Sequence, residues 1–286
     1  MNIEKISQNF FPPLLREIPD LPEHIYVKGT LPSQEIYTYL TIVGSRKCTT
    51  YGKEVVKKCI ENLRGLPVCI VSGLALGIDT IAHRTALEVG LPTISIPGSG
   101  IGEDVIYPRT NLSLAREIVE KGGALLSEYE PDFKATQWSF PKRNRIMAGI
   151  SHTTLVIEAE GKSGTLITSR LANEYNRDVI AVPGSIFSQT SHGTNALISD
   201  GATPLLSPSD LPLLLGFKNE TEQKMLPLEI LTDHEVHIIK LLSEPLSRSE
   251  LMRLSPLSHS ETIVSITSLE LKEYIVESAG KIQKIR

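Results

Sequence analysis

Short apolar segments alternate with amphipathic ones from Tyr39 to about Leu215, and no other feature of the sequence restricts the fold so strongly. The apolar segments have the length of buried strands, and the segments between them repeat apolar residues at helical spacing. We predict strands over residues 40–43, 68–71, 93–96, 124–126, 154–157 and 179–182. Strands that alternate with helices form βαβ units. The pattern therefore predicts an α/β fold with a largely parallel, doubly wound sheet over residues 38–216.

The N-terminal residues 1–37 lack this alternation and are rich in proline. Their prolines are Pro12, Pro13, Pro19, Pro22 and Pro32. Because proline fixes φ and donates no backbone hydrogen bond, this density argues against a long helix or a central strand. We expect residues 1–37 to form an extended arm that packs on the next domain.

The C-terminal residues change character again. Residues 217–230 are polar and charged, which predicts a linker. After them, helix-like stretches over 233–242, 249–254 and 261–272 precede two strand-like runs, over 274–276 and 282–285. Three helices followed by a hairpin are typical of a winged helix, and other small helical domains share the pattern. We predict a small winged-helix-like domain over residues 231–286.

Composition restricts where the chain works and what it binds. Of the 286 residues, 41% are hydrophobic and 22% are charged, which is typical of a globular protein. No apolar run approaches the roughly 20 residues that span a bilayer, and we find no signal peptide. Three cysteines without a CxxC pair fit a reducing compartment, so we expect a cytoplasmic protein with no membrane contact. Since the net charge is −4, any binding of nucleic acid must rest on a local basic patch.

Glycine-rich segments follow four of the predicted strands, over residues 44–46, 72–79, 98–102 and 161–165. In open α/β sheets, ligands bind at the carboxyl ends of strands, where glycine lets the backbone approach and helix N-termini bind anions. One such loop alone indicates only a tight turn, but four around one crevice favour a phosphate site. None fits the GxGxxG or Walker A fingerprint, so the sequence does not indicate a dinucleotide or ATP site.

The segment Phe140-Pro141-Lys142-Arg143-Asn144-Arg145 places three positive charges within four residues of an acidic protein. Arginine pairs with phosphate through two hydrogen bonds, and aromatic rings stack on bases. With Arg46 in the crevice and Trp138 nearby, the segment fits a channel for single-stranded nucleic acid. A solvated helix start with both aromatic rings in the core is nearly as well supported. We hypothesise that Arg46, Lys142, Arg143 and Arg145 meet in one site.

Other residues do not indicate catalysis. His83 follows Asp79 by four residues, so the two side chains share a helix face. A capping aspartate and a hydrogen-bonded histidine explain this spacing better than an acid–base pair. No serine lies in a hydrolase motif, and His234 and His237 lack neighbours that would complete a metal site. We predict no catalytic residue, no metal and no cofactor.

An ordered set of short motifs over about residues 10–210 resembles the DprA (Smf) family of DNA-processing proteins. The motifs are Phe11-Pro12-Pro13-Leu14-Leu15, Ile42-Val43-Gly44-Ser45-Arg46, Ser72-Gly73-Leu74-Ala75, Gly77-Ile78-Asp79, Ala82-His83, Tyr107-Pro108, Leu126-Ser127-Glu128-Tyr129, Phe140-Pro141, Arg143-Asn144-Arg145-Ile146, Ser163-Gly164-Thr165, Val182-Pro183-Gly184 and Gly193-Thr194-Asn195. Each motif alone is weak, but the set is specific in its order and spacing.

The resemblance implies an extended Rossmann-like domain that binds single-stranded DNA in a basic pocket. By position, Gly44, Ser45 and Arg46 would line the pocket floor, and the cations Lys142, Arg143 and Arg145 would contact phosphates. Phe140 would contact a base, and the other implied site residues are Gly73, Asn144, Ser163, Gly164 and Thr165.

Family members are not known as enzymes, and the resemblance implies a similar role for this chain. They protect incoming DNA during natural transformation and help to load the RecA recombinase. They act as homodimers and form larger assemblies on DNA. Many end in a small winged-helix-like domain, which matches the pattern over residues 231–286.

A nucleotide-processing phosphoribohydrolase of the lonely-guy type is the main alternative, because that family has a similar Rossmann-like core. Its motif PGGxGTxxE carries a catalytic glutamate. Aligned on Gly164-Thr165, this chain has Glu160 for the proline, Lys162 for the second glycine and Thr168 for the glutamate. The phosphate-binding part of the motif largely remains and the catalytic part is absent, which favours a binding protein.

Overall fold

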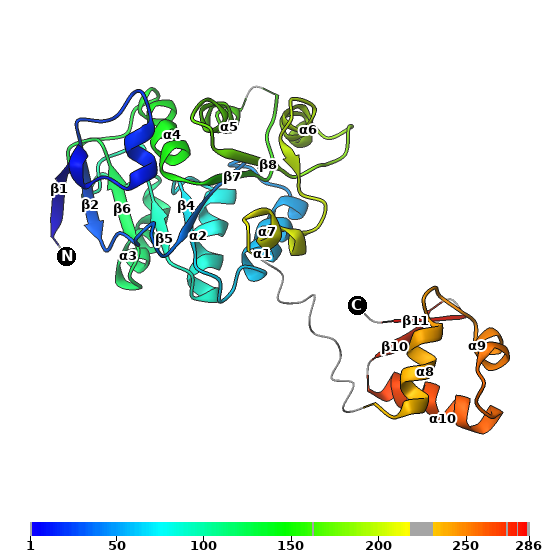
Figure 1. The fold of residues 1–286 in the computed structure, drawn as a ribbon. Coiled ribbons are helices and arrows are strands. Elements are labelled where there is room, and N and C mark those ends of the chain that lie inside the picture. The colour runs from blue at the N-terminus through cyan, green and yellow to red at the C-terminus, as the bar shows by residue number, and fades with distance from the viewer. Residues whose placement is uncertain (1, 162, 218–230, 273, 279, 285–286) are drawn as a thin grey trace. The chain divides into compact units, whose positions relative to one another are not determined.

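A nine-stranded sheet organises the N-terminal part of the chain in the computed structural model (Figure 1). The strand order is β1-β2-β6-β5-β4-β3-β7-β8-β9, and the strands from β6 to β9 run parallel. The predicted strands are confirmed with ends that shift by one or two residues: β3 (Thr38–Val43), β4 (Val68–Ser72), β5 (Thr93–Ser95), β6 (Ala124–Ser127), β7 (Thr153–Val156) and β8 (Asp178–Ala181). The short strand β9 (Thr203–Pro204) was not predicted.

The structure describes residues 2–161, 163–217, 231–272, 274–278 and 280–284. The chain divides into two compact units, Met1–Lys218 and Asn219–Arg286. The linker predicted over 217–230 lies outside the described residues except for Phe217. None of the described helices is long and apolar enough to cross a bilayer.

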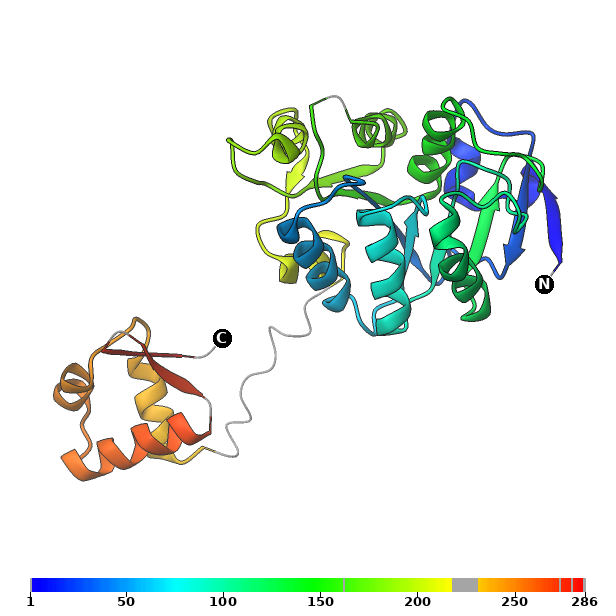
Figure 2. The same cartoon turned by 180° about the vertical axis from the view of Figure 1, so that it is seen from behind.

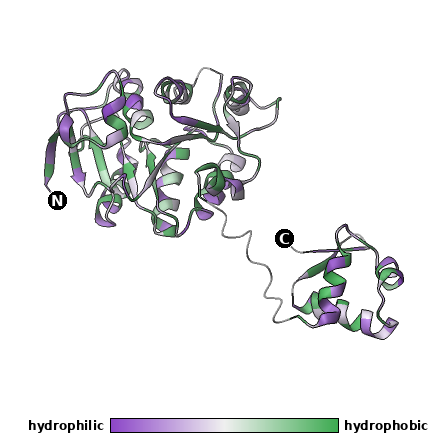
Figure 3. Cartoon of the chain, in the orientation of Figure 1, coloured by the Kyte–Doolittle hydropathy of each residue, from purple (hydrophilic) through white to green (hydrophobic). Residues whose placement is uncertain are grey.

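Helices cover both faces of the sheet, as Figures 1 and 2 show. One face carries α1 (Thr50–Glu61), α2 (Ile78–Val89), α3 (Leu112–Glu120) and α7 (Leu211–Leu214), and the other carries α4 (Ser139–Ile150), α5 (Thr165–Glu174) and α6 (His192–Ser199). Separate apolar clusters fill the two interfaces. Figure 3 shows apolar residues on the central strands and on parts of the helices. Because helices cover both faces, the residues of β4, β5, β6 and β7 are buried on either side of the sheet, and the doubly wound prediction is confirmed.

The N-terminal prediction is wrong in one respect, because residues 1–37 add two strands to the sheet. β1 (Ile3–Ser7) pairs antiparallel with β2 (His24–Gly29), and β2 also pairs antiparallel with β6. β2 is therefore an interior strand of the sheet. All the prolines lie outside both strands, in the connecting segments, so they do not interrupt the hydrogen-bond ladder. One of these segments, η2 (Pro13–Glu17), packs on α4.

The C-terminal unit has the three helices and the hairpin that the sequence predicts. They are α8 (Asp233–Leu241), α9 (Arg248–Leu254), α10 (His259–Leu271), β10 (Ile275–Ser278) and β11 (Lys281–Lys284). Each helix begins with a capping box, in which a hydroxyl and a glutamate satisfy backbone amides at the helix start. Leu246 forms a bridge to Ile282, which ties the segment before α9 to the hairpin. This arrangement is typical of a winged helix.

Glu235 joins the start of α8 to the end of α10. Its carboxylate accepts the Thr232 amide at 2.7 Å, Ser268 Oγ at 2.7 Å and Lys272 Nζ at 2.6 Å. Burial alone would raise the pKa of Glu235, but these hydrogen bonds outweigh burial and lower the pKa to about 2. The buried carboxylate is therefore charged and fully engaged at neutral pH.

We predict that Glu235→Ala lowers the free energy of unfolding of the C-terminal unit by roughly 2–3 kcal/mol, because it removes hydrogen bonds to a charged group. Hydrogen exchange of α8 and α10 in the full chain measures this loss. The exposed Glu244 gives the control, and Glu244→Ala is expected to be neutral. Since the pKa lies below its ordinary value of 4.5, the contribution of Glu235 is present above pH 4.5 and is lost as the pH falls toward 2. Equal effects of the two substitutions would contradict the role given to Glu235.

Candidate functional site

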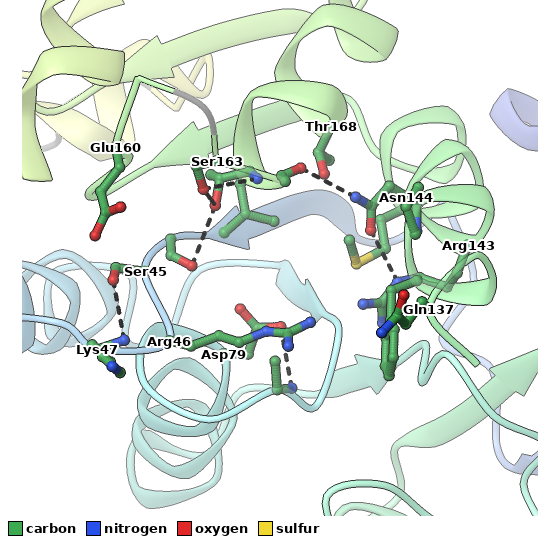
Figure 4. A pocket seen from close by; sticks show the side chains of 18 of the residues that line it. Ser45, Arg46, Lys47, Asp79, Gln137, Arg143, Asn144, Glu160, Ser163 and Thr168 are labelled. Atoms are coloured by element: carbon green, nitrogen blue, oxygen red, sulfur yellow. Dashed lines mark hydrogen bonds between the residues drawn. The ribbon is translucent and has the colours of Figure 1, made fainter. Parts of the chain in front are cut away.

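The strand order reverses between β3 and β7, and this reversal creates a crevice. After β3 the chain builds β4, β5 and β6 on one side, whereas β7, β8 and β9 extend the sheet on the other. The loops that leave β3 and β7 therefore diverge at the carboxyl edge of the sheet, which is where ligands bind in open α/β folds. A cavity of about 730 Å³ lies at this point, and we call it the switch-point crevice. Figure 4 shows it from close by.

Most of the predicted site residues line this crevice. They are Gly44, Ser45, Arg46, Phe140, Arg143, Asn144, Ser163, Gly164 and Thr165. They come from the loop after β3, from α4, and from the segment between β7 and α5. The structure therefore brings together residues that are more than one hundred positions apart in the sequence.

A hydrogen bond joins the two diverging loops across the crevice. Thr165 Oγ1 donates to the Gly44 carbonyl at 3.3 Å, and within the segment after β7 the Thr165 amide donates to Ser163 Oγ at 3.2 Å. Gly44 is required here, because a Cβ atom would lie 2.6 Å from Ile78 Cγ1. The floor of the crevice is thus backbone that packs directly on α2.

Glu158 holds the far end of the loop after β3. Its carboxylate, 2% exposed at the end of β7, accepts the Thr49 amide at 3.0 Å and Thr49 Oγ1 at 2.5 Å. Thr49 caps α1 by accepting the Gly52 amide. The loop that carries Arg46 is therefore fixed at both ends, by Thr165 and by Glu158.

Arg143 provides a buried cation at the wall of the crevice. Its guanidinium donates to the Gly73 carbonyl at 2.8 Å and to the Ile96 carbonyl, and its Nε donates to Asn144 Oδ1 at 3.1 Å. Burial lowers the pKa of Arg143 to about 10, with the charge of Asp79 opposing the shift. Arg143 is therefore still protonated at neutral pH.

Asp79 supplies the matching negative charge. Its carboxylate accepts the amides of Gly73 and Ala75, so it holds the loop after β4. Burial raises the pKa of Asp79, and the nearby charges of Arg143 and Arg46 oppose this shift. Gly77 is the N-cap residue of α2. Asp79, which we expected to cap this helix, instead holds the loop that precedes it.

Arg46 is the accessible arginine of the crevice, and the exposed Lys47 follows it in the lining. Arg46 is exposed, and its guanidinium lies 5.1 Å from the centre of the Phe140 ring. Phe140 in turn contacts Tyr107 at 5.8 Å between ring centres, and it packs so closely on Gly98 that a Cβ there would lie 2.4 Å from the ring. An exposed guanidinium above a fixed aromatic ring offers contacts for both a phosphate and a base.

Lys142 and Arg145 do not join this site, which corrects the hypothesis that the four cations meet. They line a separate hollow with Asp20 and Leu21. Arg145 is buried and pairs with Glu128 at 2.5 Å, and Lys142 approaches the same carboxylate at 3.4 Å. The reason is helical periodicity, because residues 142 and 145 share one face of α4 while 140, 143, 144 and 147 share another.

Gly73 and Trp138 do not line the crevice. The amide of Gly73 donates to Asp79 and its carbonyl accepts from Arg143. Trp138 is 55% exposed and packs one edge against Tyr129 and Phe133, so it is neither a core residue nor part of the crevice wall.

His83 is buried, and its Nδ1 lies 2.7 Å from Thr93 Oγ1. Burial lowers the pKa of His83 to about 3, so the ring is neutral at physiological pH. This confirms the prediction of a hydrogen-bonded histidine. Among the described residues, no three His, Cys, Asp or Glu side chains are placed to hold a metal ion.

Some residues that line the crevice were not predicted from the sequence, among them Lys47, Tyr107 and Gln137. Tyr107 and Gln137 lie in the long segments after β5 and β6, where the lack of a regular pattern hides which side chain turns inward. Their position after strand ends was the available signal.

An open α/β sheet with a crevice at its switch point defines a Rossmann-like protein. The family model of the DNA recombination-mediator protein A matches residues 2–215, and the chain belongs to this family. The match covers the N-terminal unit and ends before the C-terminal one.

Curated relatives agree with this assignment. The chain is 40% identical to protein Smf of Escherichia coli over 205 residues, which are 72% of this chain and 54% of the relative. It is 41% identical to the DNA processing protein DprA of Streptococcus pneumoniae over 206 residues, which are 72% of this chain and 71% of the relative. The matched region thus spans about half of the first relative's length.

Solved structures share the fold. The DprA structure from Streptococcus pneumoniae superposes with a TM-score of 0.68 at 38% identity, covering 76% of this chain and 75% of that one. A structure of DprA from Helicobacter pylori, described in terms of its single-stranded DNA binding mode, gives a TM-score of 0.68 at 30% identity and covers 76% of this chain and 97% of that one. The extended Rossmann-like fold implied by the resemblance is therefore confirmed.

We predict that Gly73→Ala destabilises the N-terminal unit by roughly 1–3 kcal/mol, the usual cost of overpacking. A Cβ at Gly73 would lie 2.5 Å from Arg143 Nη1, and the guanidinium cannot move without losing its carbonyl partners. Gly164→Ala is the matched control, because a Cβ there meets no atom within 4 Å. Urea denaturation measures both variants, and a neutral Gly73→Ala would show that Arg143 is not held as described.

Proposed function

We propose that the N-terminal unit binds single-stranded DNA in the switch-point crevice and that the chain works as a recombination mediator. The observation that carries this proposal is the exposed Arg46 above the Phe140 ring, with the buried Arg143 beside it. Arg46 pairs with a phosphate, and Phe140 offers its ring to a base. The binding mode named for the Helicobacter pylori relative supports the same ligand class here.

Two of the predicted cations have a different role in this proposal. Arg145 stabilises the fold through Glu128 and Asp20, and Lys142 adds positive charge beside the same carboxylate. The residues proposed to contact DNA are Gly44, Ser45, Arg46, Phe140, Arg143, Asn144, Ser163, Gly164 and Thr165. Backbone-directed contacts of this kind tolerate any base sequence.

The wider role in this proposal follows from membership of the family. The chain protects incoming single-stranded DNA during natural transformation and helps to load RecA onto it. It acts as a homodimer and in larger assemblies on DNA. These steps need binding and no bond cleavage, so the proposed protein is not an enzyme.

The described carboxylates that line the crevice support binding over hydrolysis. They are Asp79 and Glu160. Asp79 is engaged by two backbone amides, and Thr168 stands where a phosphoribohydrolase of the lonely-guy type carries its catalytic glutamate. Release of a base from nucleoside monophosphates is the activity that this alternative predicts.

We predict that Arg46→Ala weakens the binding of a labelled oligo-dT by roughly ten-fold or more, because it removes a charge-assisted hydrogen bond to phosphate. Fluorescence anisotropy across a salt series measures the change. The dependence of log affinity on log salt is expected to become shallower by roughly 0.7, the value for one phosphate of a single strand.

Arg64→Ala is the control, since Arg64 is an exposed arginine just beyond the opposite end of α1. It is expected to leave affinity and salt dependence unchanged. A wild-type protein that binds no oligo-dT but releases base from a nucleoside monophosphate would replace this proposal by the hydrolase.

A further inference from the structure

The exposed aromatic residues of the N-terminal unit all lie at one edge of the sheet. In the described part of this unit they are Phe10, Tyr51, Tyr107, Trp138 and Phe187. Each belongs to a segment that follows the carboxyl end of a strand running in the common direction: β1, β3, β5, β6 and β8 respectively. The other aromatic residues described in this unit are buried or half-buried.

Single exposed apolar residues are ordinary on a protein surface, so the exposure of one ring indicates nothing by itself. The informative feature is the shared position of the rings. All five follow the carboxyl ends of strands, at the edge where the crevice opens, and none lies in the described loops at the opposite edge. Phe187 is the extreme case, with 92% of its surface exposed next to Ile186 at 74%.

The segment that carries Phe187 is attached to the wall of the crevice. The Thr190 carbonyl accepts the Ala159 amide at 2.8 Å, directly beside Glu160 of the crevice wall. On the other side, Tyr51 Oη donates to the Pro183 carbonyl at 2.9 Å. The ring of Tyr51 therefore lies beside the segment that carries Phe187. In the sequence, Tyr51 comes four residues after Lys47, which lines the crevice.

We infer that single-stranded DNA continues out of the crevice in both directions along the carboxyl edge, with Trp138 on one flank and Tyr51 and Phe187 on the other as base-stacking platforms. This inference rests on the proposed function and extends it. From β6 to β8 the edge crosses five strand spacings, or about 24 Å at about 4.8 Å each. At about 3.4 Å per stacked nucleotide, this length accommodates roughly seven nucleotides.

Stacking, not charge, holds the flank toward Phe187 in this inference. The crevice contains Arg46, Lys47 and Arg143, whereas the segment toward Phe187 begins at the exposed Glu160. A base on that flank therefore gains from contact between rings, and Phe187 itself adds no cation for the phosphate. Loss of a flanking ring is expected to lower affinity without changing the salt dependence, in contrast to Arg46→Ala.

The test uses the full chain, oligo-dT of increasing length, and the variants Phe187→Ala, Phe187→Tyr and Ile36→Ala. We expect Phe187→Ala to weaken binding of a twenty-nucleotide oligo-dT by roughly five-fold or more, with an unchanged salt slope. Phe187→Tyr keeps the ring and is expected to restore the affinity. Ile36→Ala, which removes an apolar side chain that is 65% exposed at the opposite edge, is expected to have no effect.

A second readout comes from Trp138, the only tryptophan of the chain. Stacking of a base on its ring is expected to quench its emission as oligo-dT is added. The wild-type affinity is expected to rise with length up to roughly seven nucleotides, and in Phe187→Ala the rise ends at a shorter length.

The possible failures are distinguishable. If the wild type binds and Arg46→Ala weakens binding while Phe187→Ala does not, the flanking platforms are wrong and the proposed function stands. If Phe187→Ala changes the sedimentation of the protein without DNA, Phe187 belongs to a contact between copies and the inference is overturned. A wild type that binds no oligo-dT overturns the proposed function and the inference together.

Discussion

The buried guanidinium of Arg143 is the contact on which the shape of the crevice depends. It reaches from α4 to the carbonyl of Gly73, which follows β4, and to the carbonyl of Ile96, which follows β5. One side chain therefore ties both of these loops to α4. A buried charge that loses its partners costs several kcal/mol. Asp79 and the two carbonyls must therefore all be in place, and the close packing at Gly73 follows from this requirement.

The two arginines of the crevice differ in their access to solvent. Arg143 is enclosed and is held by two backbone carbonyls, while Arg46 is exposed beside the Phe140 ring. The net charge of −4 shows that the protein as a whole does not attract a polyanion. The cations Arg46, Lys47 and Arg143 line one concave crevice and concentrate positive potential there, which is the local feature that a phosphate site in an acidic chain requires.

The parallel strands were predictable because each is a short, mainly apolar run that is visible in the sequence by itself. The site was predictable only in part. β2 was missed because the prolines around it hid that its own residues, Ile25 to Val27, form such a run. The basic segment from Phe140 to Arg145 was read as one cluster, yet its helical geometry sends Lys142 and Arg145 to a different face from Phe140 and Arg143. Burial of Arg145 against Glu128 depends on a residue that directly follows β6, and no pattern within the basic segment indicates this contact.

The two outermost strands have a consequence for how such a molecule associates. At one side of the sheet, β9 has only two residues and one of them is Pro204; at the other, β1 presents the exposed charges of Glu4 and Lys5. Short strands, proline and edge charges all discourage backbone pairing with another chain. Growth of the sheet by backbone pairing is therefore disfavoured at both sides, which protects the protein against fibrous aggregation and leaves the side chains of helices and loops as the surfaces for any contact between copies.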